Sequence, residues 1–376
     1  MAGRVLLCNR EANVLSRLFT RSQWPIGLEL GHRQVRLLQA GGSRSGWQVH
    51  ALAERPLTGG PAVDEPTYHE AVAEAVAAIV SEGRFVGTEL ISAPPTSVVQ
   101  VKNLRLPIMP AHELTEAVMW EANDRLKIDR NTNEIRFFNA GEVRQGTETR
   151  QEVILLAVPR TFIEAHVEAM AKLGLDVVAI DAPMAALARA VHEQAPALPR
   201  TEADDDAAAA LASGASAVAS DARLILQVGE RETQVVIARG RQISFFKLID
   251  FGLTSLRETW SAAGITVDDM TQPGEAAVRA ASGVLSELVR ELVLCLRYYS
   301  VTFRGDRPVQ AVLAGAGAMP WLAKGLGEQT SMDVRCAELI ADDAVARTTP
   351  GGVAAWCAAC GLALHPRAGM SAGRAA

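Results

Sequence analysis

The sequence lacks the features of a disulfide-bonded, membrane-spanning or polyanion-binding protein. Its five cysteines are odd in number and scattered over 376 residues, which fits a reducing compartment. No apolar segment is as long as the roughly 18 residues that a membrane-spanning helix needs. The N-terminus has no signal-peptide core followed by a cleavage site. The net charge of −6 gives no general attraction for nucleic acid or anionic lipid. We therefore expect a cytoplasmic protein without a transmembrane segment or a nucleic-acid partner, in which any anion site is local.

Motifs of catalytic and metal sites are also scarce. Cys357 and Cys360 have the spacing of a redox motif, but they lie in an Ala-rich segment without a second cysteine pair, which favours a structural role. No Ser/His/Asp arrangement or carboxylate pair can be argued from the sequence. We predict neither a catalytic residue nor a metal site.

What the chain does contain is enough apolar sequence for a large interior. Hydrophobic residues make up 49% and charged residues 21%, and the length suits two domains or one duplicated fold. Residues 196–222 are rich in Ala, Ser and Asp and predict a flexible linker. Residues 1–22 form a basic N-terminal segment, for which a membrane-surface helix and a frayed tail both stay open. Residues 365–376 are expected to form a disordered tail.

A strand, turn and strand pattern occurs once on each side of the linker. In "PIGLELGHRQVRLL" apolar residues alternate with polar ones up to Gly31 and resume at Val35. "LILQVGERETQVVIARG" repeats the pattern, with Gly229 aligned on Gly31 and Gln227 aligned on Glu29. A turn glycine can adopt φ > 0 and can let a phosphate approach backbone N–H groups without a Cβ in the way. The occurrence of one such hairpin in each half indicates a duplication.

Two further segments add to this organisation. The turn Gly315–Gly317 follows a predicted strand and opens a predicted helix, where helix-terminal N–H groups favour the sugar or phosphates of a nucleotide. Between about Ser97 and Asp181 the predicted order is β-α-β-β-α-β, which indicates a small sheet-and-helix module.

Together these segments resemble the PilM family of type IV pilus assembly proteins, relatives of the cell-division protein FtsA in the actin-like ATPase superfamily. The resemblance covers nearly all of residues 25–364. Its most specific stretches include "SAPPTSVVQVKNLRLP", "ELTEAVMWEANDRLKI", "RELVLCLRYYS" and "VQAVLAGAGAMPWLAKGL". It implies an α/β actin-like ATPase fold, made of duplicated ribonuclease-H-like domains with an inserted β-α-β-β-α-β subdomain.

The resemblance also implies boundaries and a partner. Residues 23–96 and 183–195 would form the first actin-like half, residues 97–182 the inserted subdomain, and residues 223–364 the second half. Proteins of this family bind the short cytoplasmic N-terminal peptide of PilN. We therefore expect a PilN-like inner-membrane partner that holds the chain at the cytoplasmic face. Contacts with other pilus platform or motor proteins and self-association stay open.

The cofactor that the resemblance implies is ATP with magnesium, bound in a central cleft. The first hairpin, the second hairpin and the adenosine turn would supply the following positions: Glu29, Gly31, His32, Arg33, Gln34, Arg36, Gln227, Gly229, Glu230, Gly315, Ala316 and Gly317.

This chain departs from the family pattern at both hairpins. The first usually reads Asp-x-Gly-Ser-Ser-Ser with a closing lysine, whereas here Glu29 replaces the acid, the serines are absent and Arg36 replaces the lysine. The expected acid of the second hairpin is Gln227, which can neither act as a base nor offset magnesium charge. We therefore expect little or no ATPase activity. The side chains of His32, Arg33 and Arg231 either pair with phosphates or fill an empty cleft.

Three functions follow as hypotheses. The first is a pilus assembly scaffold with a degenerate adenine-nucleotide cleft. The second is an active ATPase that uses Glu29 with magnesium and cleft closure to switch its affinity for a partner. The third is a platform component of type II secretion, which normally continues into a membrane helix.

Overall fold

The computed structural model describes residues 24–43, 46–194, 222–303, 307–339 and 352–366. The basic segment 1–22, nearly all of the linker 196–222 and the tail from residue 367 lie outside the described residues. Among the residues that are described, no helix is both long and apolar enough to cross a membrane.

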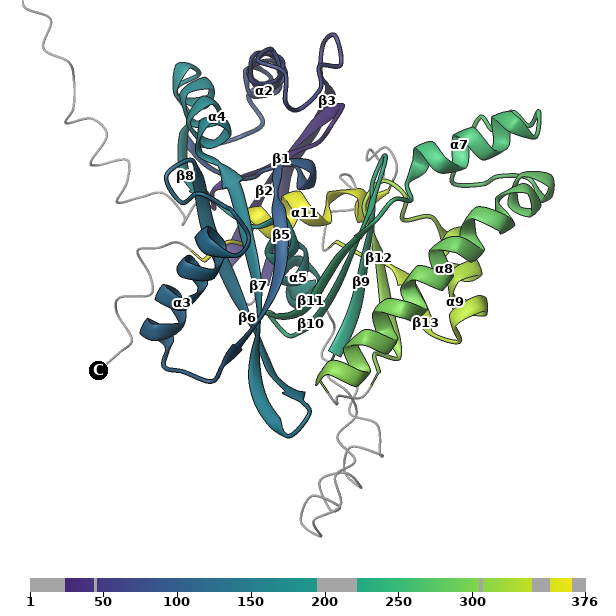
Figure 1. Ribbon diagram of the computed structural model, residues 1–376. Helices are drawn as coiled ribbons and strands as arrows, with labels where there is room; N and C mark the ends of the chain where they lie inside the picture. The colour runs from purple at the N-terminus through teal and green to yellow at the C-terminus, as the bar shows by residue number, and fades with distance from the viewer. Residues whose placement is uncertain (1–23, 44–45, 195–221, 304–306, 340–351, 367–376) are drawn as a thin grey trace, which may run out of the picture.

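Two five-stranded sheets form the body of the molecule, and their topologies are the same (Figure 1). Three antiparallel strands are followed by two strands that run parallel to the first strand of the set. In spatial order the first sheet consists of β3 (Gly46–Pro56), β2 (Gln34–Ser43), β1 (Ile26–Leu30), β4 (Glu89–Ala93) and β8 (Asp176–Ile180). The second sheet consists of β11 (Gln242–Ile249), β10 (Thr233–Arg239), β9 (Ala222–Val228), β12 (Gln310–Ala314) and β13 (Asp333–Cys336). The duplication predicted from the two hairpins is therefore confirmed.

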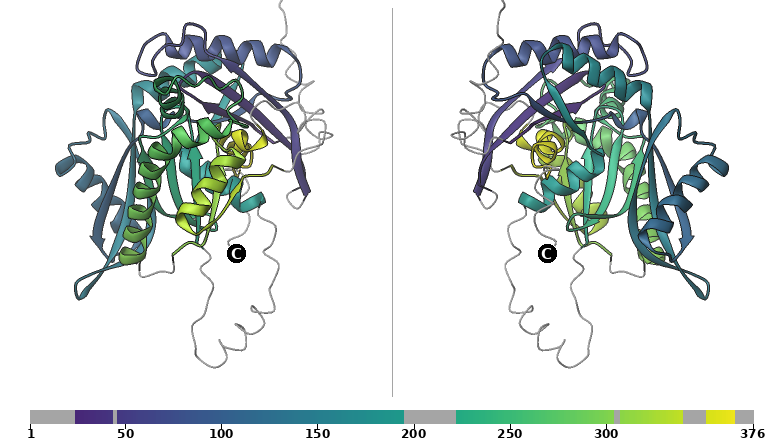
Figure 2. Two further views of the ribbon diagram at one scale, coloured as in Figure 1. Left: turned by 90° about the vertical axis from the view of Figure 1, so that its right-hand side faces the viewer. Right: turned by 90° about the vertical axis from the view of Figure 1, so that its left-hand side faces the viewer.

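Helices cover both faces of each sheet, which is why the central strands are nearly continuous apolar runs. The outer face of the first sheet packs on α2 (Tyr68–Ser81) and α4 (Arg160–Lys172). The outer face of the second sheet packs on α7 (Leu253–Ala262), α8 (Glu275–Phe303) and α9 (Pro320–Thr330), as Figure 2 shows from the side. Between the sheets lies α5 (Pro183–Gln194), which contacts β9, β10 and β11.

The last helix, α11 (Cys357–Ala363), follows the short helix η2 (Val353–Trp356) and packs on α5 and β1. A Cβ added at Gly27 would lie 2.6 Å from the backbone nitrogen of Ala363, and one at Gly361 would overlap the backbone carbonyl of Ala186. The backbones are therefore in direct contact at both glycines. This helix belongs in space with the first sheet, although we expected all of residues 223–364 to form the second half.

The inserted subdomain has the predicted order of elements but is smaller than expected. Its sheet contains only β5 (Gln100–Pro107), β7 (Glu148–Pro159) and β6 (Asn133–Gln145), covered on one face by α3 (Ala111–Asp124). A short helix, η1 (Thr96–Val98), leads into it. Strand β8 instead pairs with β4 in the first sheet. Helix α4 packs on α2. It also contacts β4, because His166 Nε2 of α4 lies 2.9 Å from Ser92 Oγ of β4. The expectation of a complete β-α-β-β-α-β subdomain over residues 97–182 is therefore wrong for α4 and β8.

Candidate functional site: the cleft between the two sheets

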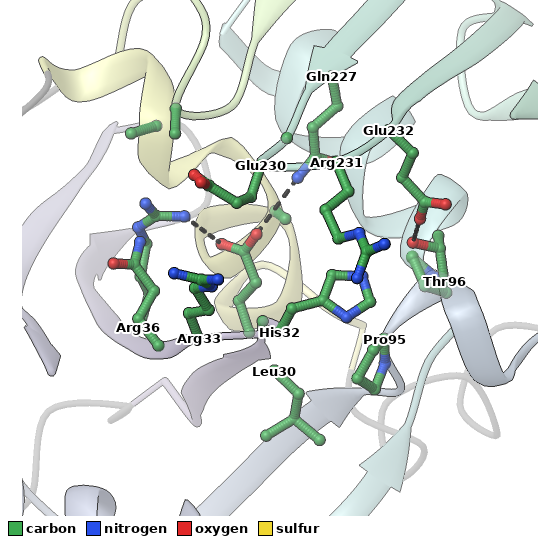
Figure 3. Close-up of a pocket in the computed structure, with 18 of the residues that line it drawn as sticks. Leu30, His32, Arg33, Arg36, Pro95, Thr96, Gln227, Glu230, Arg231 and Glu232 are labelled. Atoms are coloured by element: carbon green, nitrogen blue, oxygen red, sulfur yellow. Dashed lines mark hydrogen bonds and ion pairs between the residues drawn. The ribbon is translucent and has the colours of Figure 1, made fainter. Parts of the chain in front are cut away.

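A cleft of about 650 Å³ opens between the two sheets where their hairpins face each other (Figure 3). The turns after β1 and β9, the segment after β4 and the helix α11 line it. Among the positions that the sequence assigned to a nucleotide site, those that line the cleft are Glu29, Gly31, His32, Arg33, Gln34, Arg36, Gln227, Gly229, Glu230 and Ala316. Gly315 and Gly317 do not line it.

The two hairpin turns have the same geometry. The N–H of Gly31 donates to the carbonyl of Gln34 at 3.0 Å, and the N–H of Gly229 donates to the carbonyl of Glu232 at 2.9 Å. Neither glycine has a positive φ, so neither turn uses the left-handed conformation that glycine permits. The requirement is close approach instead, because a Cβ at Gly31 would lie 2.6 Å from the Gln34 oxygen.

The turn at Gly315–Gly317 uses two of its N–H groups inside the protein. Gly315 donates to the Ala354 carbonyl at 2.9 Å, and Gly317 donates to the Val228 carbonyl at 3.0 Å. Gly315 has φ +84°, and a Cβ there would lie 2.5 Å from the Val228 oxygen. These two glycines therefore let the turn pack against β9, and their N–H groups are already used within the protein. Their assignment to a nucleotide site stays a prediction.

A buried polar bridge joins the two sheets at the floor of the cleft. Gln227 Nε2 donates to Glu29 Oε1 at 3.2 Å, and Gln234 Nε2 donates to Gln227 Oε1 at 3.3 Å. On the other side of Glu29, the Nη1 of Arg36 lies 3.8 Å from Oε2, while Arg36 Nε donates to Glu54 Oε2 at 3.0 Å. Burial raises the pKa of Glu29 above its ordinary value, and the Arg36 charge opposes that shift only in part.

This arrangement does not fit a magnesium ion. Mg²⁺ prefers oxygen ligands in octahedral geometry, but one Glu29 oxygen accepts a hydrogen bond from the Gln227 amide and the other faces a guanidinium. A cation at this point would meet the Arg36 charge at close range. No group of three or more His, Cys, Asp or Glu side chains able to hold a metal exists among the described residues.

The turn of the second hairpin forms hydrogen bonds and an ion pair with neighbouring elements. Thr96 Oγ1 donates to Glu232 Oε1, which joins the first half to the second (Figure 3). Arg257 forms an ion pair with Glu230. The N–H of Leu253, at the start of α7, donates to the Gly229 carbonyl at 3.1 Å. The hairpin is therefore fixed both across the cleft and to its own half.

Several cleft residues were missed by the sequence analysis. Gln234 pairs with Gln227 in the same register in which Arg36 pairs with Glu29, so the hairpin alignment could have found it. The hairpin alignment could not have identified Glu54 or Thr96, because Glu54 lies on β3 and Thr96 on η1, outside both hairpins. Trp356 does not line the cleft but lies beside it, with its ring centroid 5.8 Å from Arg36 Cζ, and the sequence did not predict this contact.

Comparisons with known proteins bear on this fold and cleft. Residues 27–367 match the family model described as type IV pilus assembly protein PilM. A solved "PilM-PilN type IV pilus biogenesis complex" is similar, with a TM-score of 0.67, 21% identity, and coverage of 92% of this chain and 100% of that chain.

A second solved structure, the ethanolamine utilization protein EutJ from Carboxydothermus hydrogenoformans, has a TM-score of 0.51 and 14% identity over 95% of this chain and 98% of that one. No curated protein matches. The two ribonuclease-H-like sheets thus form the actin-like ATPase fold, and the chain belongs to the PilM family of type IV pilus assembly proteins.

Proposed function

We propose that this protein is a scaffold of type IV pilus assembly that binds the cytoplasmic N-terminal peptide of a PilN-like inner-membrane protein. The observation that supports this most is the family match over residues 27–367. The similarity of fold to a chain solved in a PilM-PilN complex agrees with it. In this proposal the protein lies at the cytoplasmic face of the inner membrane and is held there by its partner.

We further infer that the cleft does not hydrolyse ATP. A hydrolytic site needs an acid or base that activates water, with a metal that offsets the charge on the phosphates. Gln227 is neutral, and Glu29 already bonds to it at 3.2 Å. Arg36 places a permanent positive charge beside the remaining carboxylate oxygen. In this proposal the scaffold binds its partner without hydrolysing ATP.

Partner binding is tested by fluorescence anisotropy with a labelled N-terminal peptide from a PilN-like protein of the same organism. A scrambled peptide of the same composition is the control. We expect saturable binding of the native peptide that is equal in EDTA and in ATP with magnesium. Absence of binding under both conditions would contradict the scaffold proposal.

Hydrolysis is tested separately by phosphate release from ATP with magnesium. We expect no turnover above the background, and no change in the Glu29→Gln variant. Turnover that Glu29→Gln abolishes would instead establish an active ATPase, whether or not the peptide binds.

A further inference from the structure

Strand β11 lies at the edge of the second sheet and has one free side. Within the described part of the chain it pairs only with β10. The backbone N–H and C=O groups along its outer side therefore have no strand partner there. A strand of 8 residues with an unpaired side is the arrangement that a further strand can complete.

A groove runs along this free side, between β11 and α8. Its first part is a cavity of about 440 Å³ beside residues 245–247 of β11 and a stretch of α8 within residues 294–298. Its second part is a cavity of about 320 Å³ beside residues 248–251 and a stretch of α8 within residues 284–291. The helix therefore runs antiparallel to the strand along these two cavities, which we call the β11–α8 groove. A strand edge beside a helix is a geometry in which extended peptides bind.

The first cavity presents apolar side chains that are held in place. Leu294 is 49% exposed and Tyr298 is 37% exposed. The ring centroid of Tyr298 lies 5.7 Å from that of the buried Phe245. The Tyr298 hydroxyl donates to Glu152 Oε1 at 3.1 Å and accepts from Arg105 Nη2 at 3.0 Å. These contacts join α8 to the inserted sheet, so this wall of the groove is formed before a ligand arrives, which lowers the cost of binding.

The second cavity carries an excess of negative charge. Lys247 is paired with Glu291 at 2.8 Å, so these two charges offset each other. The other charged side chains that line this cavity are the carboxylates of Asp250 and Glu287 and the guanidinium of Arg290. Both carboxylates are exposed, and neither forms an ion pair with another described residue. A ligand with a basic side chain at this end is therefore complementary in charge.

We propose that the β11–α8 groove binds an extended, basic and apolar peptide segment of a partner protein, which pairs with β11 as a further strand. Because side chains alternate along a strand, every second residue of the peptide points toward α8. The first cavity takes an aliphatic or aromatic side chain against Leu294 and Tyr298. The second cavity takes a lysine or arginine, about four residues away along the peptide, beside Asp250 and Glu287. The groove lies outside the cleft between the sheets, and the inference does not rest on the PilN-like partner.

The test begins with a phage-displayed library of random peptides of about nine residues, selected on the parent protein and counter-selected on its Leu294→Lys variant. We expect enriched peptides to alternate apolar and polar residues and to carry a lysine or arginine. Fluorescence anisotropy with a labelled enriched peptide then measures affinity. Leu294→Lys should weaken binding at least about tenfold, since it places a charge in an apolar contact. Val293→Lys is the matched control, because Val293 is 41% exposed on α8 and lines neither cavity, and it should bind like the parent.

Two further measurements test the binding mode independently of the selection. N-methylation of one peptide nitrogen at a time should weaken binding about fivefold at alternate positions only, because every second N–H pairs with β11. The double variant Asp250→Asn and Glu287→Gln should weaken binding about threefold. A peptide whose basic residue is replaced by methionine should bind the double variant and the parent equally.

Four outcomes would overturn the inference. They are a lack of enriched peptides after counter-selection, N-methylation effects without alternation, a loss of affinity in Val293→Lys as large as in Leu294→Lys, and displacement of the enriched peptide by the PilN-like peptide. The last outcome would assign the groove to that partner. Thermal unfolding of each variant shows that it is folded. The PilN-like peptide is also titrated into Leu294→Lys, where retained binding separates this inference from the proposed function.

Discussion

The two five-stranded sheets differ at the cross-strand pair that lies at the floor of the cleft. In the first sheet Glu29 faces Arg36, whereas in the second sheet Gln227 faces Gln234 in the same register. The two turns are closed by the same backbone hydrogen bond. The cross-strand pair of the first hairpin, however, consists of two charged side chains, and that of the second consists of two neutral amides. Duplicated strands with the same backbone geometry therefore carry side chains of different charge. The charged side chains at the floor of this cleft come from the first half alone.

A second difference lies two residues earlier on the same strands. Gly27 of β1 allows α11 to approach within backbone contact, while the aligned Ile225 of β9 packs its side chain into the core shared by both halves. The first sheet therefore depends on a helix that is distant in sequence. The second sheet fills the equivalent space with its own side chain.

The largest expected effect comes from breaking the contact of α11 with the first half. Gly361→Val should lower the free energy of unfolding by more than about 3 kcal/mol, because the added atoms overlap the Ala186 backbone. Urea unfolding measures the loss. Gly283→Ala, in α8 with nothing within 4 Å of the new Cβ, is the control and should raise stability by about 0.5 to 1 kcal/mol. Equal stability of the two variants would contradict the backbone contact.

The second effect separates the two hairpins directly. Arg36→Met leaves Glu29 and Glu54 without their buried arginine, and we expect a loss of about 3 kcal/mol at pH 7. Gln234→Met, at the equivalent register position, removes one neutral hydrogen bond of 3.3 Å and should cost about 1 kcal/mol. Chemical denaturation of both variants gives the comparison. Similar losses would show that the charged pair contributes no more than the amide pair.

The third effect is sensitivity to acid, which should be confined to the first half. Burial lowers the pKa of His166 to about 4, so the folded state binds fewer protons than the unfolded state between about pH 4 and 6.5. Stability is therefore lost as the pH falls through this window, by about 2 kcal/mol at pH 5. The corresponding helix contact in the second half, between Trp260 and Trp321 at 6.2 Å, does not titrate.

Hydrogen exchange at pH 7 and pH 5, corrected for intrinsic rates, measures this difference. We expect α2 and α4 to lose protection at pH 5, while α7 and α9 keep it. His166→Gln removes one titrating ring and should reduce the pH dependence, while His69, whose pKa burial also lowers, keeps part of it. Equal loss of protection in both halves would contradict the assignment to His166.

The smallest effect concerns Glu29 itself. Because burial raises its pKa, the folded state binds more protons than the unfolded state above about pH 4.5, and stability falls as the pH rises from there. Glu29→Gln removes this cost and keeps an acceptor for Gln227, so we expect a gain in stability at pH 7. The gain should vanish at pH 4, as measured by urea unfolding at both values. A less stable variant at pH 7 would show that the Arg36 attraction outweighs burial.

Features with a local signal could be predicted from the sequence. The apolar alternation on either side of Gly31 and Gly229 predicted both hairpins, and their alignment predicted the duplicated sheets. The family resemblance, which depends on long stretches, predicted the fold. These successes share one property, namely that the residues carrying the pattern lie close together along the chain.

Features that depend on distant partners could not be predicted in the same way. Strand β8 follows the inserted sheet in sequence but pairs with β4. The hydrophobic pattern of a strand does not indicate which other strand it pairs with. The hydrogen bond between Gln227 and Glu29 joins residues from opposite halves. The reason for Gly31 was also missed, because a required close approach and a positive φ select the same residue type.

The position of α11 has a consequence for how the chain folds during synthesis. Residues 357–363 complete the interior of the first sheet by packing on β1 and α5. Domains generally fold as units in order from the N-terminus as they leave the ribosome, but here the first domain lacks part of its interior until the second has been translated. A nascent chain arrested before residue 352 should therefore hold β1 and α5 with exposed apolar surface, and the two domains should reach their native state together.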